Sequence, residues 1–556
     1  MKKSVNDKKY LDSVDHINFS RLATDQHCEE TQATLTKSSH EVMECNRNLR
    51  RALEFFAIVI LILTLIGIII LIIVYVISLN IPDMFSVVID AGSTSSKLHL
   101  YKWTDEPFRS NGKVTEVASD KVSPGISNYV DDATEAYTAM KPKLDKLTSS
   151  LSNKQKQNTP VYLAATAGMR LKLIEDPLGS LDLFSVIRQY LLHSGLQIKT
   201  PNERIRLLYG SEEGLYGWVS VNNILGNIQE GKRTLPTDTV GSLDLGGAST
   251  QIAFIPDSYP NAPKELLDFY PLRLYGNDFL VYSHSFLCYG KSEFQRRLMT
   301  SIAARSKKTF EIPNPCLLRG YKTEKYNASD WFTGSCMTGN YVTKTFHDEI
   351  FQPSYMKEFS FEGTGEPDEC IQHMERHFKN DCNYSLCSFN NVYQPRPSGK
   401  FLAYAGFSYV MHYLFPERNT GLTLSEVTSA VKEFCRKPWT EVAKMTEENE
   451  YDFTGKYCFD GLYIVILLQK YGFTTDELWK SITFNSKING KSVSWALGYM
   501  LDQSGHLPSE SPKVSLSTKL FIVLFILLIS LFIGSVIGLL LTRFCVTQSK
   551  KSASQI

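Results

Sequence analysis

The chain has 556 residues, of which 43% are hydrophobic and 21% are charged. This length allows more than one domain. The 59 Lys and Arg residues nearly balance the 58 Asp and Glu residues. A nucleic-acid interface needs clustered basic charge, so we expect no nucleic-acid partner.

Two uncharged segments are long enough to cross a bilayer as helices. They are residues 55–79 and residues 520–541. The hydrocarbon core of a bilayer needs about 20 apolar residues in a helix, and wholly apolar core helices of this length are unusual. The first run follows a polar tail, residues 1–54, and is too long for the apolar part of a cleaved signal peptide. We therefore predict a membrane-embedded chain with two transmembrane helices, the first an uncleaved signal anchor.

Basic residues near the ends of the spans predict their orientation. Three precede the first span and three follow the second: Arg47, Arg50, Arg51, Arg543, Lys550 and Lys551. Lys513 and Lys519, on the other side of the second span, oppose this signal slightly. The tails, residues 1–54 and 542–556, are expected to be cytoplasmic. Residues 80–519 then lie outside the cell or in a lumen.

Eight of the 11 cysteines fall in this outer segment, namely Cys288, Cys316, Cys336, Cys370, Cys382, Cys387, Cys435 and Cys458. An even number in an oxidising compartment predicts disulfides. No paired CxxC or HExxH spacing favours zinc. Glycosylation sequons at Asn327 and Asn383 agree with an outer location. Cys45 and Cys545 lie near the membrane on the cytoplasmic side, where S-palmitoylation is an option.

Two similar segments of the outer part predict the same local structure. Residues 87–101 read VVIDAGSTSSKLHLY, and residues 241–254 read GSLDLGGASTQIAF. Each predicts a strand, an Asp-x-Gly turn with small and hydroxyl residues, and a second strand. A further strand is expected at 160–165, and helices at 134–151, 178–192, 423–434 and 463–471. Strands that alternate with helices predict an α/β architecture.

The repeated Asp-x-Gly turn is suited to phosphate. Glycine lets the backbone approach an anion closely, and successive N–H groups form an anion-binding nest. Asp90 and Asp244, where the strands end, can accept water ligands of Mg²⁺ or Ca²⁺. One such turn is more often only a turn. Two strand-flanked copies favour a polyphosphate held from both sides.

Other polar and aromatic residues have two readings each. Glu212 and Glu213, in YGSEEGLYGW, could supply a general base or favour a helix start. Arg170 could hold phosphate by bidentate hydrogen bonds or form a surface salt bridge. Tyr409 and Tyr457 could stack on a base, but with 28 tyrosines in the chain a packing role is the default.

Together these segments closely resemble the ecto-nucleoside triphosphate diphosphohydrolases, the apyrase family within the actin/Hsp70/sugar-kinase fold group. The likeness covers roughly residues 86–507. All five apyrase regions occur in order: 90–94 (DAGST), 165–170 (ATAGMR), 211–218 (SEEGLYGW), 244–251 (DLGGASTQ) and 495–500 (WALGYM). The two flanking apolar segments match the cell-surface branch of that family.

The resemblance implies a fold and a domain order. The ectodomain would be two-lobed and actin-like (ribonuclease H-like), with the nucleotide in a cleft between the lobes. Residues 80–209 would form lobe I and residues 210–485 the disulfide-stapled lobe II. Residues 486–519 would return to lobe I and form a juxtamembrane stalk. The implied disulfides are Cys288–Cys336, Cys316–Cys370, Cys382–Cys387 and Cys435–Cys458.

The resemblance also implies roles for individual residues. Glu213 matches the general base, and Ser249 and Gln251 match the residues that hold the attacking water. Asp90 and Asp244 match the residues that hold Ca²⁺ or Mg²⁺ through water. The implied phosphate-binding residues are Ser93, Thr94, Ser95, Thr166, Arg170, Gly246, Gly247 and Ala248.

Three aromatic residues complete the implied site. Tyr409 and Tyr457 match aromatics that sandwich the nucleotide base. Trp495 matches a residue near the phosphates without direct chemistry, although its apolar helical spacing alone predicts core packing. Two departures leave specificity open. Many relatives have His where this chain has Ser95, which bears on ATP against ADP, and often an aromatic where it has Ser408, which bears on the base.

We therefore expect an extracellular enzyme of the plasma membrane that hydrolyses ATP and ADP to the monophosphate. Three alternatives stay open: a Golgi-lumenal nucleoside diphosphatase, a kinase or chaperone on the same fold, and a receptor that binds nucleotide without turnover. Membrane helices of this family associate, so the resemblance allows a homo-oligomer through the two spans.

Overall fold

The computed structural model describes residues 28–79, 81–105, 110–307, 309–346, 350–508 and 516–553. The chain divides into two compact units, Met1–Asn80 with Val514–Ile556, and Ile81–Lys513. Predictions for residues 1–27 and 554–556, and for the side chains of Cys45 and Cys545, fall outside what the structure describes.

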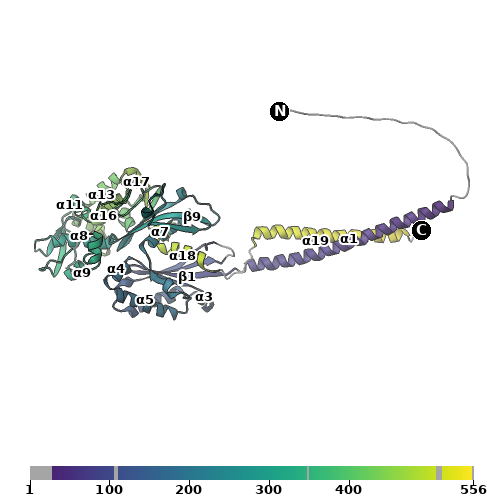
Figure 1. The fold of residues 1–556 in the computed structure, drawn as a ribbon, viewed down its shortest axis with the longest axis horizontal. Coiled ribbons are helices and arrows are strands. Elements are labelled where there is room, and N and C mark those ends of the chain that lie inside the picture. Colours follow the sequence, from purple (N-terminus) through teal and green to yellow (C-terminus); the bar gives the residue numbers. More distant parts are fainter. Residues whose placement is uncertain are drawn as a thin grey trace, which may run out of the picture. The chain divides into compact units, whose positions relative to one another are not determined.

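The first unit contains two long helices, α1 (Cys28–Leu79) and α19 (Thr518–Ala553) (Figure 1). Each contains a candidate membrane span, with mean hydropathies of 3.6 and 3.1, of which only 6% is buried. Exposed apolar surface of this length suits lipid rather than a soluble core. The two helices pack together, since Tyr75 stacks on Phe521 with ring centroids 3.9 Å apart. Both helices continue beyond the predicted spans, because their flanking polar residues also favour helix.

Residues 81–513 contain two main sheets. The strands of the first are β1 (Asp83–Ala91), β2 (Ser96–Thr104), β3 (Thr115–Val122), β4 (Val161–Ala165) and β5 (Ile205–Leu207). Those of the second are β6 (Val240–Leu245), β7 (Ser249–Phe254), β8 (Phe269–Leu274), β9 (Asn277–Leu287), β13 (Lys400–Ala405) and β14 (Ile482–Phe484). The predicted α/β architecture is confirmed.

The two sheets repeat one strand order. The first runs β3-β2-β1-β4-β5 and the second β8-β9-β7-β6-β13-β14. In each, an antiparallel hairpin (β1–β2 or β6–β7) is extended on its first strand by a parallel strand, β4 or β13. The sequence similarity between residues 87–101 and 241–254 therefore reflects one supersecondary unit used twice.

Helices cover both sheets, and their apolar faces form the core. Those nearest the first sheet are α2 (Ala133–Leu147), α4 (Ala167–Glu175) and α5 (Pro177–Leu192). Helices α7 (Gly210–Ile224) and α18 (Trp495–His506) pack on each other; α18 contacts β1 of the first sheet, and α7 contacts β6, β7 and β9 of the second. Helices of the second sheet's side include α8 (Lys291–Ala304), α12 (Gly406–Leu414), α13 (Leu424–Arg436) and α16 (Tyr457–Lys470).

The predicted helices are present with shifted ends. The helix expected at 134–151 ends at Leu147, because Thr148 caps it by donating to Leu144 and Lys146 carbonyls. The helix expected at 463–471 begins earlier, at Tyr457, because its first turn is buried around Cys458. The division into lobes at residue 209 stays a prediction, since residues 81–513 group as one unit.

Shorter elements complete the second unit. They are α3 (Asn153–Gln157), α6 (Pro201–Arg204), α9 (Ala328–Phe332), α10 (Asn340–Phe346), α11 (Pro367–Glu375), α14 (Trp439–Val442), α15 (Tyr451–Thr454), α17 (Asp476–Lys480), β10 (Glu311–Asn314), β11 (Tyr326–Asn327), β12 (Glu358–Gly363), β15 (Lys487–Ile488) and β16 (Lys491–Ser492).

Four disulfides join residues of the second half of this unit. They are Cys288–Cys336, Cys316–Cys370, Cys382–Cys387 and Cys435–Cys458, the same pairs that the family resemblance implies. Their presence fits an oxidising compartment. The sequon residues Asn327 and Asn383 are both exposed, as glycosylation requires.

Candidate active site

Two loops of the same geometry follow β1 and β6. The Gly92 N–H donates to the Ser95 carbonyl at 3.0 Å, and the Gly246 N–H donates to the Ser249 carbonyl at 3.0 Å. A Cβ atom on Gly92 would lie 2.9 Å from the Ser95 carbonyl oxygen, and one on Gly246 3.1 Å from that of Ser249. Each turn is therefore closed too tightly for a side chain, which explains the glycine.

The two loops meet. A Cβ atom on Gly247 would lie 2.9 Å from Ser93 Oγ and 3.6 Å from Thr94 Cγ2. Between the loops is a pocket of about 160 Å³. The predicted residues that line it are Asp90, Ser93, Thr94, Ser95, Thr166, Glu213, Asp244, Gly246, Gly247, Ala248, Ser249 and Trp495. Backbone N–H groups and hydroxyls on both walls suit an extended polyphosphate.

Three carboxyl groups share this pocket. Burial raises the pKa of Asp90, while Lys97 opposes the rise. Burial also raises the pKa of Asp244 to about 8, and the charges of Glu213 and Asp90 add to the effect. Carboxylates held together against their repulsion fit a hydrated divalent cation, which would relieve it. Among the described residues no cluster of three or more His, Cys, Asp or Glu is placed to hold a metal directly.

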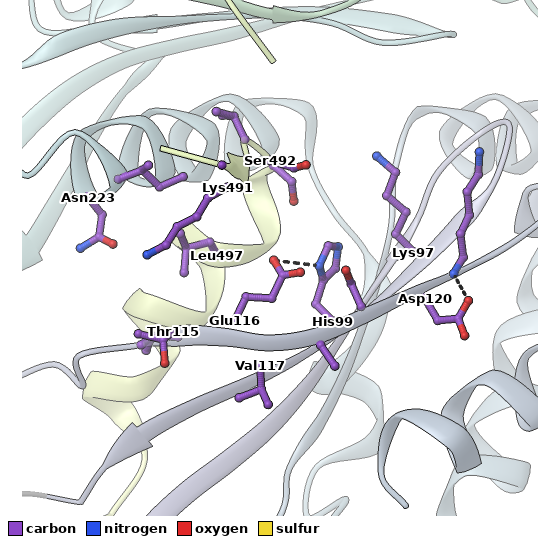
Figure 2. A pocket seen from close by; sticks show the side chains of 18 residues that line it. Lys97, His99, Thr115, Glu116, Val117, Asp120, Asn223, Lys491, Ser492 and Leu497 are labelled. Atoms are coloured by element: carbon purple, nitrogen blue, oxygen red, sulfur yellow. Dashed lines mark hydrogen bonds and ion pairs between the residues drawn. The ribbon is translucent and has the colours of Figure 1, made fainter. Parts of the chain in front are cut away.

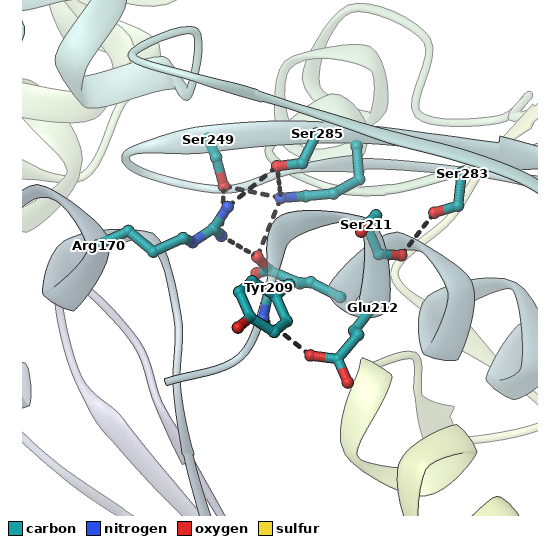
Figure 3. Close-up of polar contacts among 9 residues, drawn as sticks. Arg170, Tyr209, Ser211, Glu212, Ser249, Ser283 and Ser285 are labelled. Carbon is teal, nitrogen blue, oxygen red and sulfur yellow. Dashed lines mark hydrogen bonds and ion pairs between the residues drawn. The ribbon is translucent and has the colours of Figure 1, made fainter. Parts of the chain in front are cut away.

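The start of α7 separates its two glutamates. Glu212 accepts from the Tyr209 N–H at 2.9 Å and pairs with both Arg206 terminal nitrogens at 2.8 Å. Glu213, one residue on, is only 9% exposed and faces the pocket. The helix-start reading thus suits Glu212, and the general-base reading suits Glu213. Figure 3 shows Glu212 apart from the cluster of Arg170, Ser249 and Ser285.

Arg170 lies behind the pocket rather than on its wall. Its guanidinium forms a short ion pair with Glu213 Oε2 and donates to Ser249 Oγ and Ser285 Oγ, both at 3.3 Å. Both side chains are largely buried (12% and 11% exposed), so the pair is not a surface salt bridge; a contact between Arg170 and phosphate stays a prediction. Burial raises the pKa of Glu213 to about 7, and Arg170 opposes the rise.

Gln251 joins the same network. Its Nε2 contacts Ser249 Oγ at 2.7 Å, Ser285 Oγ at 3.0 Å and Glu213 Oε2 at 3.1 Å. Its Oε1 is buried and has no hydrogen-bond partner among the residues that the structure describes. A water between Gln251, Ser249 and Glu213 would satisfy that acceptor, because buried polar atoms are rarely left unpaired.

Two further residues of the site carry no sequence signal. Ser285 on β9 enters because it pairs in register with Gln251. Tyr404 on β13 lines the pocket and hydrogen-bonds Asp244. Strand pairing places both, so only a correct sheet topology could have predicted them.

The predicted aromatic residues fall into two places. Tyr409 and Tyr457 line a pocket of about 670 Å³, together with Ser408 and Lys487. Tyr409 is 59% exposed, so one face of its ring is accessible for stacking on a nucleotide base. Trp495 is 3% exposed, hydrogen-bonds Asp90 and lines the pocket between the loops, so it packs in the core; its place near bound phosphates stays a prediction.

Phosphate loops beside a buried carboxylate define a hydrolytic enzyme that acts on phosphate compounds. Residues 77–518 match the GDA1/CD39 (nucleoside phosphatase) family, and the chain belongs to that family. The resemblance seen in the sequence is thereby confirmed, and the family supports nucleotide hydrolysis.

Similar proteins include two enzymes from mouse and one from human. Ectonucleoside triphosphate diphosphohydrolase 1 of Mus musculus is 34% identical over 440 residues (77% of this chain, 82% of the relative). Ectonucleoside triphosphate diphosphohydrolase 3 of Mus musculus is 31% identical over 478 residues (83% and 87%). Ectonucleoside triphosphate diphosphohydrolase 8 of Homo sapiens is 33% identical over 438 residues (77% and 84%).

The fold is also found among solved structures. A nucleoside triphosphate hydrolase from Neospora caninum superposes with a TM-score of 0.56 and 16% identity, covering 77% of this chain and 95% of that one. At this identity the likeness concerns the fold alone.

Proposed function

We propose that the chain hydrolyses nucleoside tri- and diphosphates, ATP and ADP among them, to the monophosphate and phosphate outside the cell. The observation that carries this is Glu213, buried in the pocket between two phosphate loops and bonded to Gln251. The relatives are named as ectonucleoside triphosphate diphosphohydrolases, which agrees with this substrate class.

The reaction needs one proton acceptor and accurate positioning. Glu213 takes a proton from a water held by Ser249 and Gln251. The water oxygen forms a bond to the terminal phosphorus while the bridging P–O bond breaks in line, and the lower nucleotide leaves. Arg170 fixes the orientation of Glu213. Ca²⁺ or Mg²⁺, held through water by Asp90 and Asp244, would neutralise phosphate charge.

Loop N–H groups supply the remaining stabilisation. The residues whose N–H groups would do this line the pocket: Ser93, Thr94, Gly247 and Ala248. Preorganised N–H donors stabilise the negative charge that develops in the transition state. We assign the two equivalent sheets to the two predicted lobes, so that closure of one on the other would gate turnover.

The location follows from the same proposal. Disulfides and exposed sequons suit residues 80–519 outside the cell, with both tails cytoplasmic and α1 and α19 in the plasma membrane. No observation favours the Golgi lumen. Association of further copies through the membrane helices stays a proposal from the family resemblance.

The direct test is phosphate release from nucleoside tri-, di- and monophosphates with Mg²⁺, Ca²⁺ or EDTA. Intact cells expressing the chain should release phosphate from tri- and diphosphates only, and EDTA should stop it. Activity that appears only after permeabilisation would contradict the cell-surface location. Release that requires an acceptor would indicate a kinase.

The aromatic pocket gives a separate prediction. Tyr409→Ala and Tyr457→Ala should each raise KM for ATP about tenfold, because stacking on a base contributes about 1–3 kcal/mol. KM for inorganic tripolyphosphate, which has no base, should not change. Tyr259→Ala serves as the control, since Tyr259 is also exposed (43%) and lies outside this pocket. If KM for ATP is unchanged in both variants, the nucleotide base does not bind in this pocket.

A further inference from the structure

Lys97 occupies in the first sheet the position that Gln251 occupies in the second. Lys97 pairs in register with Asp90 across β1–β2, and Gln251 pairs with Asp244 across β6–β7. Both follow a loop with the same internal hydrogen bond. Gln251 reaches the pocket residues Glu213 and Ser249 through hydrogen bonds, and Lys97 lines the pocket itself.

Lys97 is attracted by the carboxylates of Asp90 and Asp244 and repelled by a neighbouring lysine. Lys97 lies directly opposite Lys121 across β2–β3, and like charges in that arrangement destabilise a sheet. Neither lysine forms an ion pair with any residue that the structure describes. Asp120, beside Lys121, pairs instead with Lys143 at 3.1 Å and Lys146 at 3.4 Å. Lys97 is exposed and has no close ion pair among the described residues, so its ammonium is available to an external anion.

A second pocket of about 650 Å³ adjoins the catalytic pocket and shares Lys97, Val493 and Ser494 with it. Lys121 and Lys491 also line this pocket. In Figure 2, His99 and Glu116 lie between Lys491 and Lys97. The side chains of His99 and Glu116 approach to 3.5 Å, and the carboxylate of Glu116 is also attracted by Lys491. Lys97 therefore lies where the adjoining pocket, which three lysines line, borders the catalytic pocket.

We propose that Lys97 is a substrate-binding residue whose ammonium contacts phosphate oxygens of the nucleotide in the catalytic pocket. Lys121 and Lys491 attract the polyphosphate towards it through the adjoining pocket, since a charged cleft raises the local concentration of a counter-ion. The inference rests on the proposed function, because that function makes the ligand a polyphosphate. The Lys97 ammonium would bind the phosphates equally well in the substrate and in the transition state. Its removal should therefore raise KM more than it lowers kcat.

The test compares Lys97→Met, Lys97→Arg and Lys121→Met, with Lys102→Met as the matched control. Lys102 is on the same strand, pairs with Asp83 at 2.8 Å and lines neither pocket. Phosphate release from ATP is measured at several salt concentrations, with binding of a non-hydrolysable ATP analogue by calorimetry. Melting curves establish that each variant is folded.

Lys97→Met should raise KM and the analogue's Kd about tenfold, keep kcat within about threefold, and flatten the salt dependence of kcat/KM. Lys97→Arg should restore KM, since the charge is kept. Lys121→Met should raise KM about threefold, an effect that salt removes. Lys102→Met should behave as the wild type.

Wild-type KM, Kd and salt dependence in Lys97→Met would overturn the inference, as would a loss of kcat alone. A Lys97→Arg variant as impaired as Lys97→Met would also overturn it. If the wild type releases no phosphate from any nucleotide, the proposed function fails. The calorimetric comparison still decides whether Lys97 binds the nucleotide.

Discussion

Glu213→Gln should lower kcat for ATP about a thousandfold and leave nucleotide binding intact. Glutamine can keep the contacts to Arg170 and Gln251 but cannot take a proton, and general-base catalysis commonly contributes about 10²–10⁴-fold. Phosphate release measures kcat, and calorimetry with the ATP analogue and Mg²⁺ measures binding. The variant retains the packing of α7, and because the folded-state pKa of Glu213 is raised, its melting temperature in EDTA at neutral pH should not fall below that of the wild type.

Its neighbour provides the control. Glu212→Gln removes the ion pair with Arg206 at a site away from the pocket, so kcat should change little. In the wild type, a base with a pKa of about 7 must be deprotonated to act. The kcat/KM should therefore fall about tenfold per pH unit below that value. Near-normal phosphate release by Glu213→Gln would assign the base to another residue.

Asp244→Asn should abolish the response to divalent cations and yet stabilise the cation-free protein. The folded-state pKa of Asp244 is raised from 3.8 to about 8, so the folded state binds this proton more tightly than the unfolded state. The stability from this group is present below pH 3.8 and is lost as the pH rises towards 8. Asparagine carries no charge, so in EDTA at pH 7.5 the variant should melt about 2–6 °C above the wild type.

The difference in melting temperature should vanish below about pH 3, where the wild-type carboxyl is protonated in both states. Adding Ca²⁺ or Mg²⁺ should raise the melting temperature of the wild type more than that of Asp244→Asn or Asp90→Asn. Asp278→Asn is the control, because Asp278 is an exposed partner of Arg273. If the activity of both Asp90→Asn and Asp244→Asn depends on the cation as in the wild type, these residues do not hold the cation.

Local patterns predicted the elements that are themselves local. The Asp-x-Gly turns could be predicted because strand, glycine and hydroxyl residues are contiguous, and the membrane segments because their length and apolarity suffice. The choice between Glu212 and Glu213 depended on the rotation of α7 and on Arg206, which the motif does not show. Arg170 lies behind Glu213 rather than on the pocket wall, which only packing decides.

Residues placed by pairing between distant strands could not be predicted. Ser285 enters through its register with Gln251, and Tyr404 through the parallel pairing of β13 with β6. Lys97 lies within the first predicted segment, yet its importance depends on Lys121 opposite it and on the two pockets that it borders. Each case needs a sheet topology that no local pattern specifies.

The repeated strand order gives the molecule a duplicated scaffold whose two halves carry different functional groups. After matching loops, one half presents Ser95 and Lys97 and the other Ser249 and Gln251. Under the proposed function, the amide side prepares the water and the ammonium side receives the charge of the phosphates. This inequality gives the substrate a single orientation between two similar walls, so that the terminal phosphate, and not the sugar end, meets the nucleophile.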